Sequence, residues 1–160
     1  MAAPTTLMGM SGATLSISAT LPATYDATGY GTTTGLAWTL IGEIENFGPH
    51  GVTASISKFT SVGTAVVEKL KGSKDYGSGT YTVGMISSDA GLAIANAASE
   101  SQNRYSIKLT YPQGTGSTSE IHYFDALVSE YQYLDGTVDT VAKVQFKLEI
   151  CRKPVVVAAT

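Results

Sequence analysis

The sequence predicts a mainly β protein: a sandwich or barrel of about seven or eight antiparallel strands with one flanking α-helix. Short segments in which apolar and polar residues alternate recur along the chain, and turns rich in glycine, serine and threonine separate them. Only 14% of the residues are charged, which is typical of β-rich structural proteins with uncharged contact surfaces. One segment alone changes from the period of a strand to that of a helix.

A chain of 160 residues, of which 43% are hydrophobic, is long enough to bury one core and too short to argue for several. We expect a single domain over residues 1–160, with a partly flexible region at 1–35 and a C-terminal tail at 152–160. The start of the chain lacks a basic segment followed by a continuous apolar one, so no secretory signal is expected. No apolar run approaches the roughly 20 residues of a membrane helix. The protein is therefore expected to be made in a cytoplasm and to have no membrane partner.

The first strand is predicted at residues 13–21, where Leu15 and Ile17 alternate with serines. Residues 24–35 are rich in glycine and threonine and are expected to form a mobile connection.

The second strand is predicted at residues 37–46, and it carries two acidic side chains. On this prediction Leu40 and Ile44 share one face with Trp38, whereas Ile41, Glu43 and Glu45 share the other, the two acids about 7 Å apart. The segment FGPHG ends the strand, because proline cannot donate to a β ladder and glycine favours a turn. The two acids fit a solvated strand face or a functional acidic surface equally well, and a carboxylate pair for glycoside hydrolysis is a remote alternative.

Three strands are predicted in the middle of the chain, at residues 53–59, 64–71 and 80–87, the last with alternating apolar residues. The period then changes. Residues 87–102 are predicted to form the helix, since they are rich in alanine, begin with serine and aspartate residues that can cap the first turn, and place small apolar residues on one face.

Three more strands are predicted in the last third, at residues 104–112, 120–134 and 141–151. In the first of them Ile107 and Leu109 are expected to point inward, together with Tyr105 and Tyr111, and Ser106, Lys108 and Thr110 outward. Residues 113–119 are predicted to form a hairpin loop. The phase of the apolar residues changes within 120–134, which predicts a β-bulge near Phe124.

No enzyme motif is complete. GMSGA at residues 9–13 lacks the last glycine of a nucleophile elbow, and GSGT at 77–80 lacks the third glycine and the helix of a dinucleotide loop. Cys151 is the only cysteine, so no intramolecular disulfide is possible. His50 and His122 share no acidic spacing and are expected to be surface or hydrogen-bonded side chains. We therefore expect no enzyme, no cofactor and no metal.

The net charge of −3 and the pI near 5.3 exclude the basic surface of an ordinary nucleic-acid-binding protein. An acidic surface would repel phosphate groups rather than hold them.

The order of elements resembles that of the tail tube proteins of long-tailed bacteriophages. The resemblance covers residues 36–150 and rests on the segments WTLIGEIENFGPHG, ISKFTSVGTAVVEKLKG, GTYTVGMISSDAGLAIANA, YSIKLTYPQGTG and VDTVAKVQFKLEI. It implies a β-sandwich with one flanking helix, six copies closed into a ring, and rings stacked into a hollow tube through which double-stranded DNA passes. Contractile-tail tubes and type VI secretion tubes share the fold. The family also implies a place in the virion tail, with tape measure and tail terminator proteins as partners.

On this resemblance, the face with Glu43 and Glu45 would line the lumen, and a ring of six subunits would present about 12 carboxylates in each layer. The expected contacts between subunits lie in the threonine-rich stretch, in residues 48–64 and in the tail, and the candidate contact residues are Tyr30, His50, Phe59, Pro154, Val155 and Val156. The alternative from another class is a β-sandwich binding module of a phage or bacterial surface structure, which the same fold could host.

Overall fold

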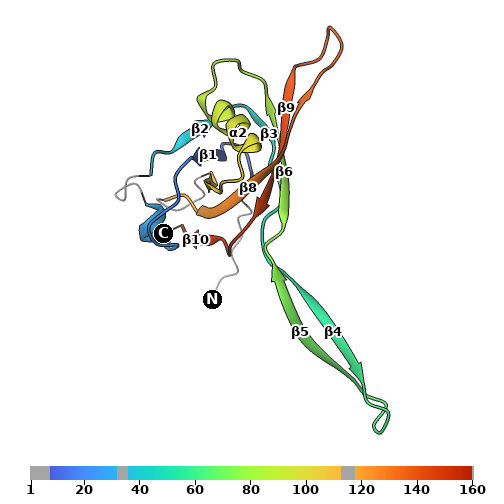
Figure 1. Ribbon diagram of the computed structural model, residues 1–160. Helices are drawn as coiled ribbons and strands as arrows, with labels where there is room; N and C mark the ends of the chain where they lie inside the picture. Colours follow the sequence, from blue (N-terminus) through green and yellow to red (C-terminus); the bar gives the residue numbers. More distant parts are fainter. Residues whose placement is uncertain (1–7, 32–35, 113–117, 160) are drawn as a thin grey trace.

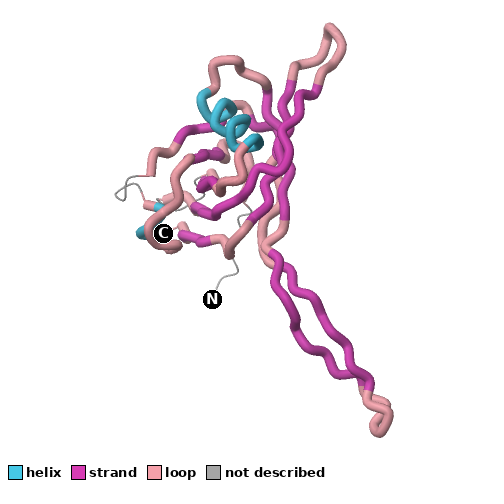
Figure 2. The backbone as a smooth tube through the Cα atoms, in the orientation of Figure 1, coloured by secondary structure: helices cyan, strands magenta, loops and turns pink. Residues whose placement is uncertain are grey.

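The computed structural model describes residues 8–31, 36–112 and 118–159. The chain is mainly β, as the alternation predicted, and one helix of 11 residues packs against the sheet (Figure 1). Eight strands form one antiparallel sheet, and two further strands form a long hairpin that projects away from it (Figure 2).

The strands and helices follow one another along the chain as β1 (Thr14–Ser18), α1 (Ala27–Tyr30), β2 (Thr39–Ile41), β3 (Ile44–Asn46), β4 (Thr53–Thr60), β5 (Val67–Asp75), β6 (Ser78–Gly84), α2 (Ala90–Glu100), β7 (Tyr105–Thr110), β8 (Ile121–Leu134), β9 (Lys143–Ile150) and β10 (Val155–Val157). The large sheet has the order β2-β1-β7-β8-β9-β6-β3, and β10 pairs with the first part of β8. The hairpin consists of β4 and β5.

The sheet curls until its two edges almost meet. Strands β2 and β3 are the opposite edges of the order, yet only Gly42 and Glu43 separate them in the chain. The three steps from Ile41 to Ile44 span at most about 11 Å, so the edges must lie close together in space and the sheet must approach a barrel. Glu43 makes this crossing with a left-handed backbone, at φ 50°, and its carbonyl accepts a 2.8 Å hydrogen bond from the Gly84 N–H.

This crossing corrects the prediction of one strand over residues 37–46. Because the segment is two short strands on opposite edges, Ile41 is 2% exposed in the core and Leu40 is 54% exposed, the reverse of the predicted faces. Glu43 belongs to neither strand.

The helix α2 closes one side of the curled sheet, as its pattern predicted. Leu92, Ala95 and Ala98 are buried against the core, and the small residues let the helix lie close to β1, β2 and β8. Asp89 is the N-cap: its Oδ1 accepts hydrogen bonds from the N–H groups of Gly91 (2.8 Å) and Leu92 (3.1 Å). Its Oδ2 accepts a third, from the Gly42 N–H (2.8 Å), so one carboxylate joins the helix to the crossing between β2 and β3.

The main core fills the interior of the curled sheet. Its buried members come from six strands and α2, and they are Leu15, Ile17, Ile41, Tyr81, Val83, Leu92, Ala95, Ala98, Ile107, Leu109, Phe124, Ala126, Val128, Val144, Phe146, Leu148 and Ile150. Strand β9 has a buried residue at every second position, which confirms its predicted alternation. In β1, Leu15 and Ile17 are buried as predicted, but Ser16 and Ser18 are buried too and Ala19 is exposed, so the predicted alternation is wrong there. Tyr105 and Tyr111 of the β7 region are only partly buried and pack against this core.

A second, smaller cluster covers the outer face of β8. Tyr123 is its centre, with the ring of Tyr30 stacked on it at 5.3 Å between centroids and the ring of Trp38 at 5.8 Å. Val155 and Val157 of β10 pack against the same cluster. Both faces of β8 are therefore buried over its first half, the inner face in the main core and the outer face here.

The two cores explain the phase change that predicted a bulge near Phe124. That prediction is wrong: the pairing of β8 with β7 is regular through Phe124, and the register shift lies between Val128 and Glu130, opposite β9. The apolar residues change phase because the two faces of β8 meet different clusters.

Other boundaries also differ from the sequence prediction. Strand β5 begins at Val67 and extends to Asp75, into the expected turn. Met85 lies beyond the end of β6 and is 46% exposed. Ser106, which was predicted to point outward, is fully buried. Its hydroxyl is satisfied there, because it donates a 2.7 Å hydrogen bond to the carbonyl of Thr20.

The two chain ends also carry more structure than the sequence predicted. Besides the predicted strand β1, residues 8–31 hold the capped turn α1, and the tail holds β10. Most of the predicted loop at 113–119, together with residues 1–7 and 32–35 of the predicted N-terminal region, lies outside the described residues.

Candidate assembly interface

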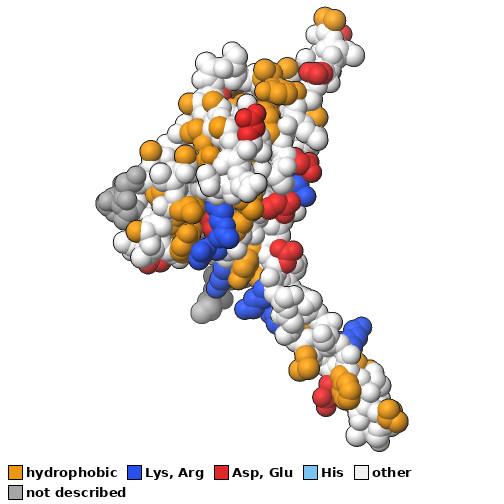
Figure 3. Space-filling view, in the orientation of Figure 1, with side chains coloured by type: hydrophobic (Ala, Val, Ile, Leu, Met, Phe, Trp, Pro, Cys, Tyr) orange, Lys and Arg blue, Asp and Glu red, His pale blue; other side chains and the backbone are white. Residues whose placement is uncertain are grey.

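The most unusual surface is the β4–β5 hairpin, which projects away from the body of the protein (Figures 1 and 3). Every residue of β5 and all of β4 except Ala54 are exposed. The hairpin and its flanks carry a set of exposed apolar side chains: Val52, Ile56, Phe59, Val62, Val66, Val67 and Leu70. An isolated two-stranded hairpin is marginally stable in water, so this one is suited to being covered by another molecule.

The register of the hairpin gives it two different faces. Lys58 lies directly opposite Lys69, and Ile56 lies opposite Lys71, so these side chains share one face. A register shift then places Lys74 opposite Ala54, on the same face as Ile56. We call this set of Lys58, Lys69, Lys71 and Lys74 the lysine face.

The other face of the hairpin is more apolar. Leu70 lies opposite Ser57 and Phe59 lies opposite Glu68. Phe59, a predicted contact residue, is 61% exposed here. The hairpin therefore offers a cationic surface and an apolar surface on its two sides.

The base of the hairpin is fixed to the body by a close backbone contact. The segment Phe47–His50 runs from β3 toward β4 and crosses β6 at Gly79. A Cβ atom on Gly79 would lie 2.7 Å from the carbonyl oxygen of Pro49, and one on Gly48 would meet the backbone of Gly79 equally closely. Only glycine at both positions permits this approach.

A pair of histidines holds the same segment. His50 Nε2 and His122 Nδ1 are 2.6 Å apart, and His122 Nε2 is 2.7 Å from Glu120 Oε1. The ring of His50 also stacks on Phe124, at 5.5 Å between centroids. The prediction of surface or hydrogen-bonded histidines is confirmed, but no pattern in the sequence indicates that the two rings bind one another.

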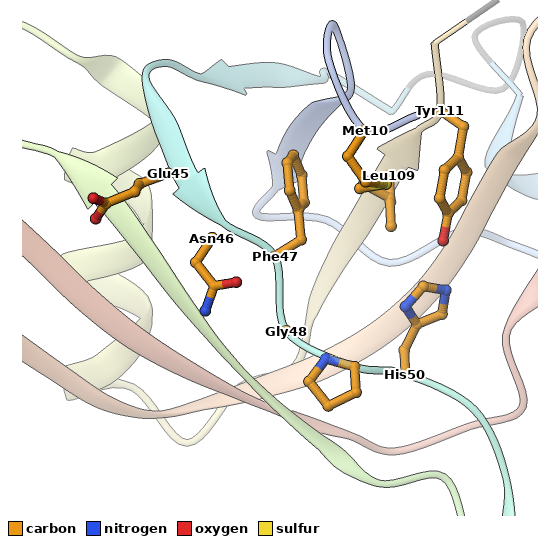
Figure 4. A pocket seen from close by; sticks show the side chains of 9 residues that line it. Met10, Glu45, Asn46, Phe47, Gly48, His50, Leu109 and Tyr111 are labelled. Carbon is orange, nitrogen blue, oxygen red and sulfur yellow. The ribbon is translucent and has the colours of Figure 1, made fainter. Parts of the chain in front are cut away.

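His50 of this pair lines a cleft of about 530 Å³ at the hairpin base. Figure 4 shows His50 and Tyr111 facing one another across it, with Phe47 and Gly48 on the segment that leads to the hairpin. Burial, together with the neighbouring His122, lowers the pKa of His50 below its usual 6.5. In this hydrogen bond one ring nitrogen must donate and the other must accept. The contact is therefore compatible with one protonated ring, whereas protonation of both rings would leave no acceptor.

The acidic residues of the predicted lumen do not lie on one regular strand. Glu43 is exposed in the crossing, and Glu45 is exposed in β3, where its Oε1 is 2.6 Å from Lys143 Nζ. The register shifts between Ile44 and Asn46. The prediction that the two acids share a strand face is therefore wrong, and their position in a lumen stays a prediction.

The remaining contact candidates are divided between the interior and the surface. Tyr30 is 1% exposed and is a core residue of the subunit, so an interface role does not fit it. Pro154 and Val155 are half-buried, and Val155 packs into the second cluster. Val156 is 54% exposed and is the one of the three tail candidates that is available to a neighbour.

A buried carboxylate that the sequence analysis missed anchors the start of the tail. Asp125 is fully buried in β8, and its Oδ2 is 3.4 Å from Arg104 Nη1 and 3.5 Å from Arg152 Nε. Arg152 also lies over the ring of Tyr25, 3.8 Å from its centroid. Burial raises the pKa of the neighbouring Cys151 thiol, which disfavours the reactive thiolate.

Within the described ranges, no three His, Cys, Asp or Glu side chains are grouped so that they could hold a metal ion. None of the described helices is both long and apolar enough to cross a membrane.

No protein-family model matches the sequence, and no characterised protein matches it by sequence. Solved structures do match it in fold. A chain of the anti-feeding prophage baseplate is similar with a TM-score of 0.66 and 12% identity, over 99% of this chain and 98% of that one. The SPP1 tail tube is similar with a TM-score of 0.61 and 13% identity, over 90% of this chain and 75% of that one.

A third match is a chain of the sheath/tube terminator structure of an extracellular contractile injection system, with a TM-score of 0.67 and 11% identity, over 98% of this chain and all (100%) of that one. The chain therefore has the tail tube fold that the sequence resemblance predicted. At these identities the likeness concerns the fold.

Proposed function

We propose that the protein is a structural subunit of a bacteriophage tail tube, in which six copies close into a ring and stacked rings form a conduit for double-stranded DNA. The fold supports a tube-like role, because the similar structures come from a tail tube, a baseplate and a tube terminator. These neighbours are structural proteins, which fits a protein that is not an enzyme. The whole chain then acts as one tail tube domain in the virion tail, after synthesis in the host cytoplasm.

The observation that carries the proposal is the exposed β4–β5 hairpin. Its apolar side chains gain nothing from the rest of the subunit, whereas a neighbouring copy would remove them from water at roughly 25 cal/mol for each Å² of apolar surface. The hairpin contacts a surface of the neighbour that differs from itself, so the contact is heterologous and either closes a ring or propagates. No cofactor is needed for this assembly.

In the proposed tube, Glu43 and Glu45 contribute to an acidic lumen of about 12 carboxylates in each layer, which repels phosphates and lets DNA pass without being held. The ends of the tube bind a tape measure protein and a tail terminator.

Electron microscopy of the purified protein with a chelator present tests the proposal. We expect six-membered rings or tubes from the intact chain. A variant in which an Asn-Gly turn replaces residues 53–75 should keep the circular dichroism of a β protein and remain monomeric. A monomer of the intact chain at high concentration, at every salt concentration tried, would refute the proposal and favour a monomeric binding module.

A further inference from the structure

The charges of the chain are distributed unevenly between the hairpin and the body. Residues 53–75 contain four lysines and two acids, Glu68 and Asp75, so this segment has a net charge of +2. Because the whole chain has a net charge of −3, the residues outside the segment have a net charge of −5. The acids of the segment are separated from the lysines: Glu68 lies opposite Phe59 on the other face, and Asp75 lies next to Lys74 on the strand, where side chains alternate between faces. All the charged side chains on this face of the hairpin are therefore cationic.

The lysine face is also electrostatically unfavourable in the isolated subunit. Lys58 and Lys69 are a directly opposed pair of like charges, which destabilises a two-stranded ladder. The ion pairs of lysine and arginine in the described part of the chain involve other residues, namely Arg104, Lys143, Lys147 and Arg152. A partner that brings carboxylates to this face would relieve the repulsion.

A complementary surface lies at the opposite end of the same molecule. The turn between β8 and β9, residues 135–142, projects away from the body on the side opposite the β4–β5 hairpin (Figure 1). It contains Asp135 and Asp139 and no cationic residue. Val138 is fully exposed and Val141 is 69% exposed in the same turn.

We propose that the lysine face of one copy docks on the 135–142 turn of a second copy, as the axial contact of the tube. This contact rests on the proposed function and specifies which surfaces of stacked subunits meet. Two carboxylates and two exposed valines on the turn match the lysines and the exposed Ile56 and Val67 on the same face of the hairpin. Because the two surfaces lie at opposite ends of the subunit, the contact repeats without closing and extends the tube.

The apolar residues favour a protein partner over nucleic acid. Ile56 lies opposite Lys71 and is 52% exposed, and Val67 lies beyond the Lys58–Lys69 pair and is 48% exposed. A phosphate backbone offers these side chains no apolar surface. The two valines of the 135–142 turn offer such an apolar surface, and the two aspartates of that turn would repel DNA.

Charge reversal of the full chain tests the contact. Variant one is Lys58→Glu/Lys69→Glu/Lys71→Glu, and variant two is Asp135→Lys/Asp139→Lys. Each variant alone should keep its circular dichroism but show a critical concentration for tube formation raised by about tenfold or more, because like charges then meet across the contact. An equimolar mixture should recover tubes, since the Glu hairpin of one variant meets the Lys turn of the other. The matched controls, Lys→Arg and Asp→Glu at the same positions, should assemble like the wild type.

The outcomes separate this contact from the proposed function. Wild-type tubes together with normal tubes from both reversal variants would overturn the contact and leave the tube subunit standing. Failure of each variant without recovery in the mixture would also overturn it. Binding of a short random-sequence DNA duplex that is lost in variant one, while its tubes form normally, would assign the lysine face to nucleic acid. A wild-type protein that never assembles would overturn the tube function and the contact together.

Discussion

The Asp89 carboxylate is the point at which we expect one substitution to loosen both the helix and the closure of the sheet. It accepts three backbone hydrogen bonds, from Gly91 and Leu92 at the start of α2 and from Gly42 between β2 and β3. Asp89→Ala removes a helix cap, at a cost of about 1 kcal/mol. It also leaves the half-buried Gly42 N–H without its acceptor, which costs about 1–2 kcal/mol more.

The expected loss is therefore about 2–3 kcal/mol in the free energy of unfolding, or a fall in Tm of about 5–10 °C for a domain of this size. Urea unfolding followed by circular dichroism measures it most directly in the hairpin-deleted background, where assembly does not contribute to stability. Ser88→Ala is the matched control, because Ser88 is exposed and adjacent to the cap. A loss below about 0.5 kcal/mol for Asp89→Ala would refute the reasoning that this side chain joins the two elements.

Three further predictions concern the hairpin base and the acids. Gly48→Ala should displace the hairpin from the body, because the added methyl group meets the backbone of β6 at Gly79. We expect impaired assembly with little change in the circular dichroism of the β structure. Gly63→Ala, in the open loop of the hairpin, is the control. The pKa of His50 is lower in the folded state than its usual 6.5, so its contribution to stability is complete above about pH 6.5 and is lost as the pH falls toward the folded value. The urea midpoint should therefore fall as the pH is lowered below about 6.5, and His50→Gln should flatten this dependence; an equal slope in both proteins would show that other groups cause it. Changing Glu43 and Glu45 together to Lys should cost at most about 1 kcal/mol, since among the described residues the ion pair lost is the exposed one of Glu45 with Lys143. The change should nevertheless slow DNA passage through assembled tails in a salt-dependent manner. Unaltered ejection kinetics with an intact tube would place these acids outside the lumen.

The site could be predicted from the sequence only in part. Lys69 and Lys71 alternate visibly along one strand, so a cationic strand face was within reach of the pattern. Lys58 and Lys74 join that face only through the pairing register and its shift, which the sequence does not display. Phe59 was predicted as a contact residue within the 48–64 segment and is exposed, whereas Tyr30 lies in a glycine-rich stretch that resembles a loop and is nevertheless buried.

The sequence by itself determined the elements whose burial is one-sided. Strand β9 has buried residues at every second position, and α2 buries Leu92, Ala95 and Ala98, because a strand or helix with one face on a core repeats with its own period. Such patterns are local and require no knowledge of the partner element.

The tertiary structure alone decided the features that depend on two distant segments or on two covered faces. The break at Glu43 follows from the closure of the sheet, since a chain that passes from one edge to the other must leave the regular strand conformation. The phase change in β8 follows from a second cluster on its outer face. His50 and His122 are 72 residues apart in the chain and meet at a single hydrogen bond. Period-2 alternation records which residues avoid water, and it carries no information about which segment covers them.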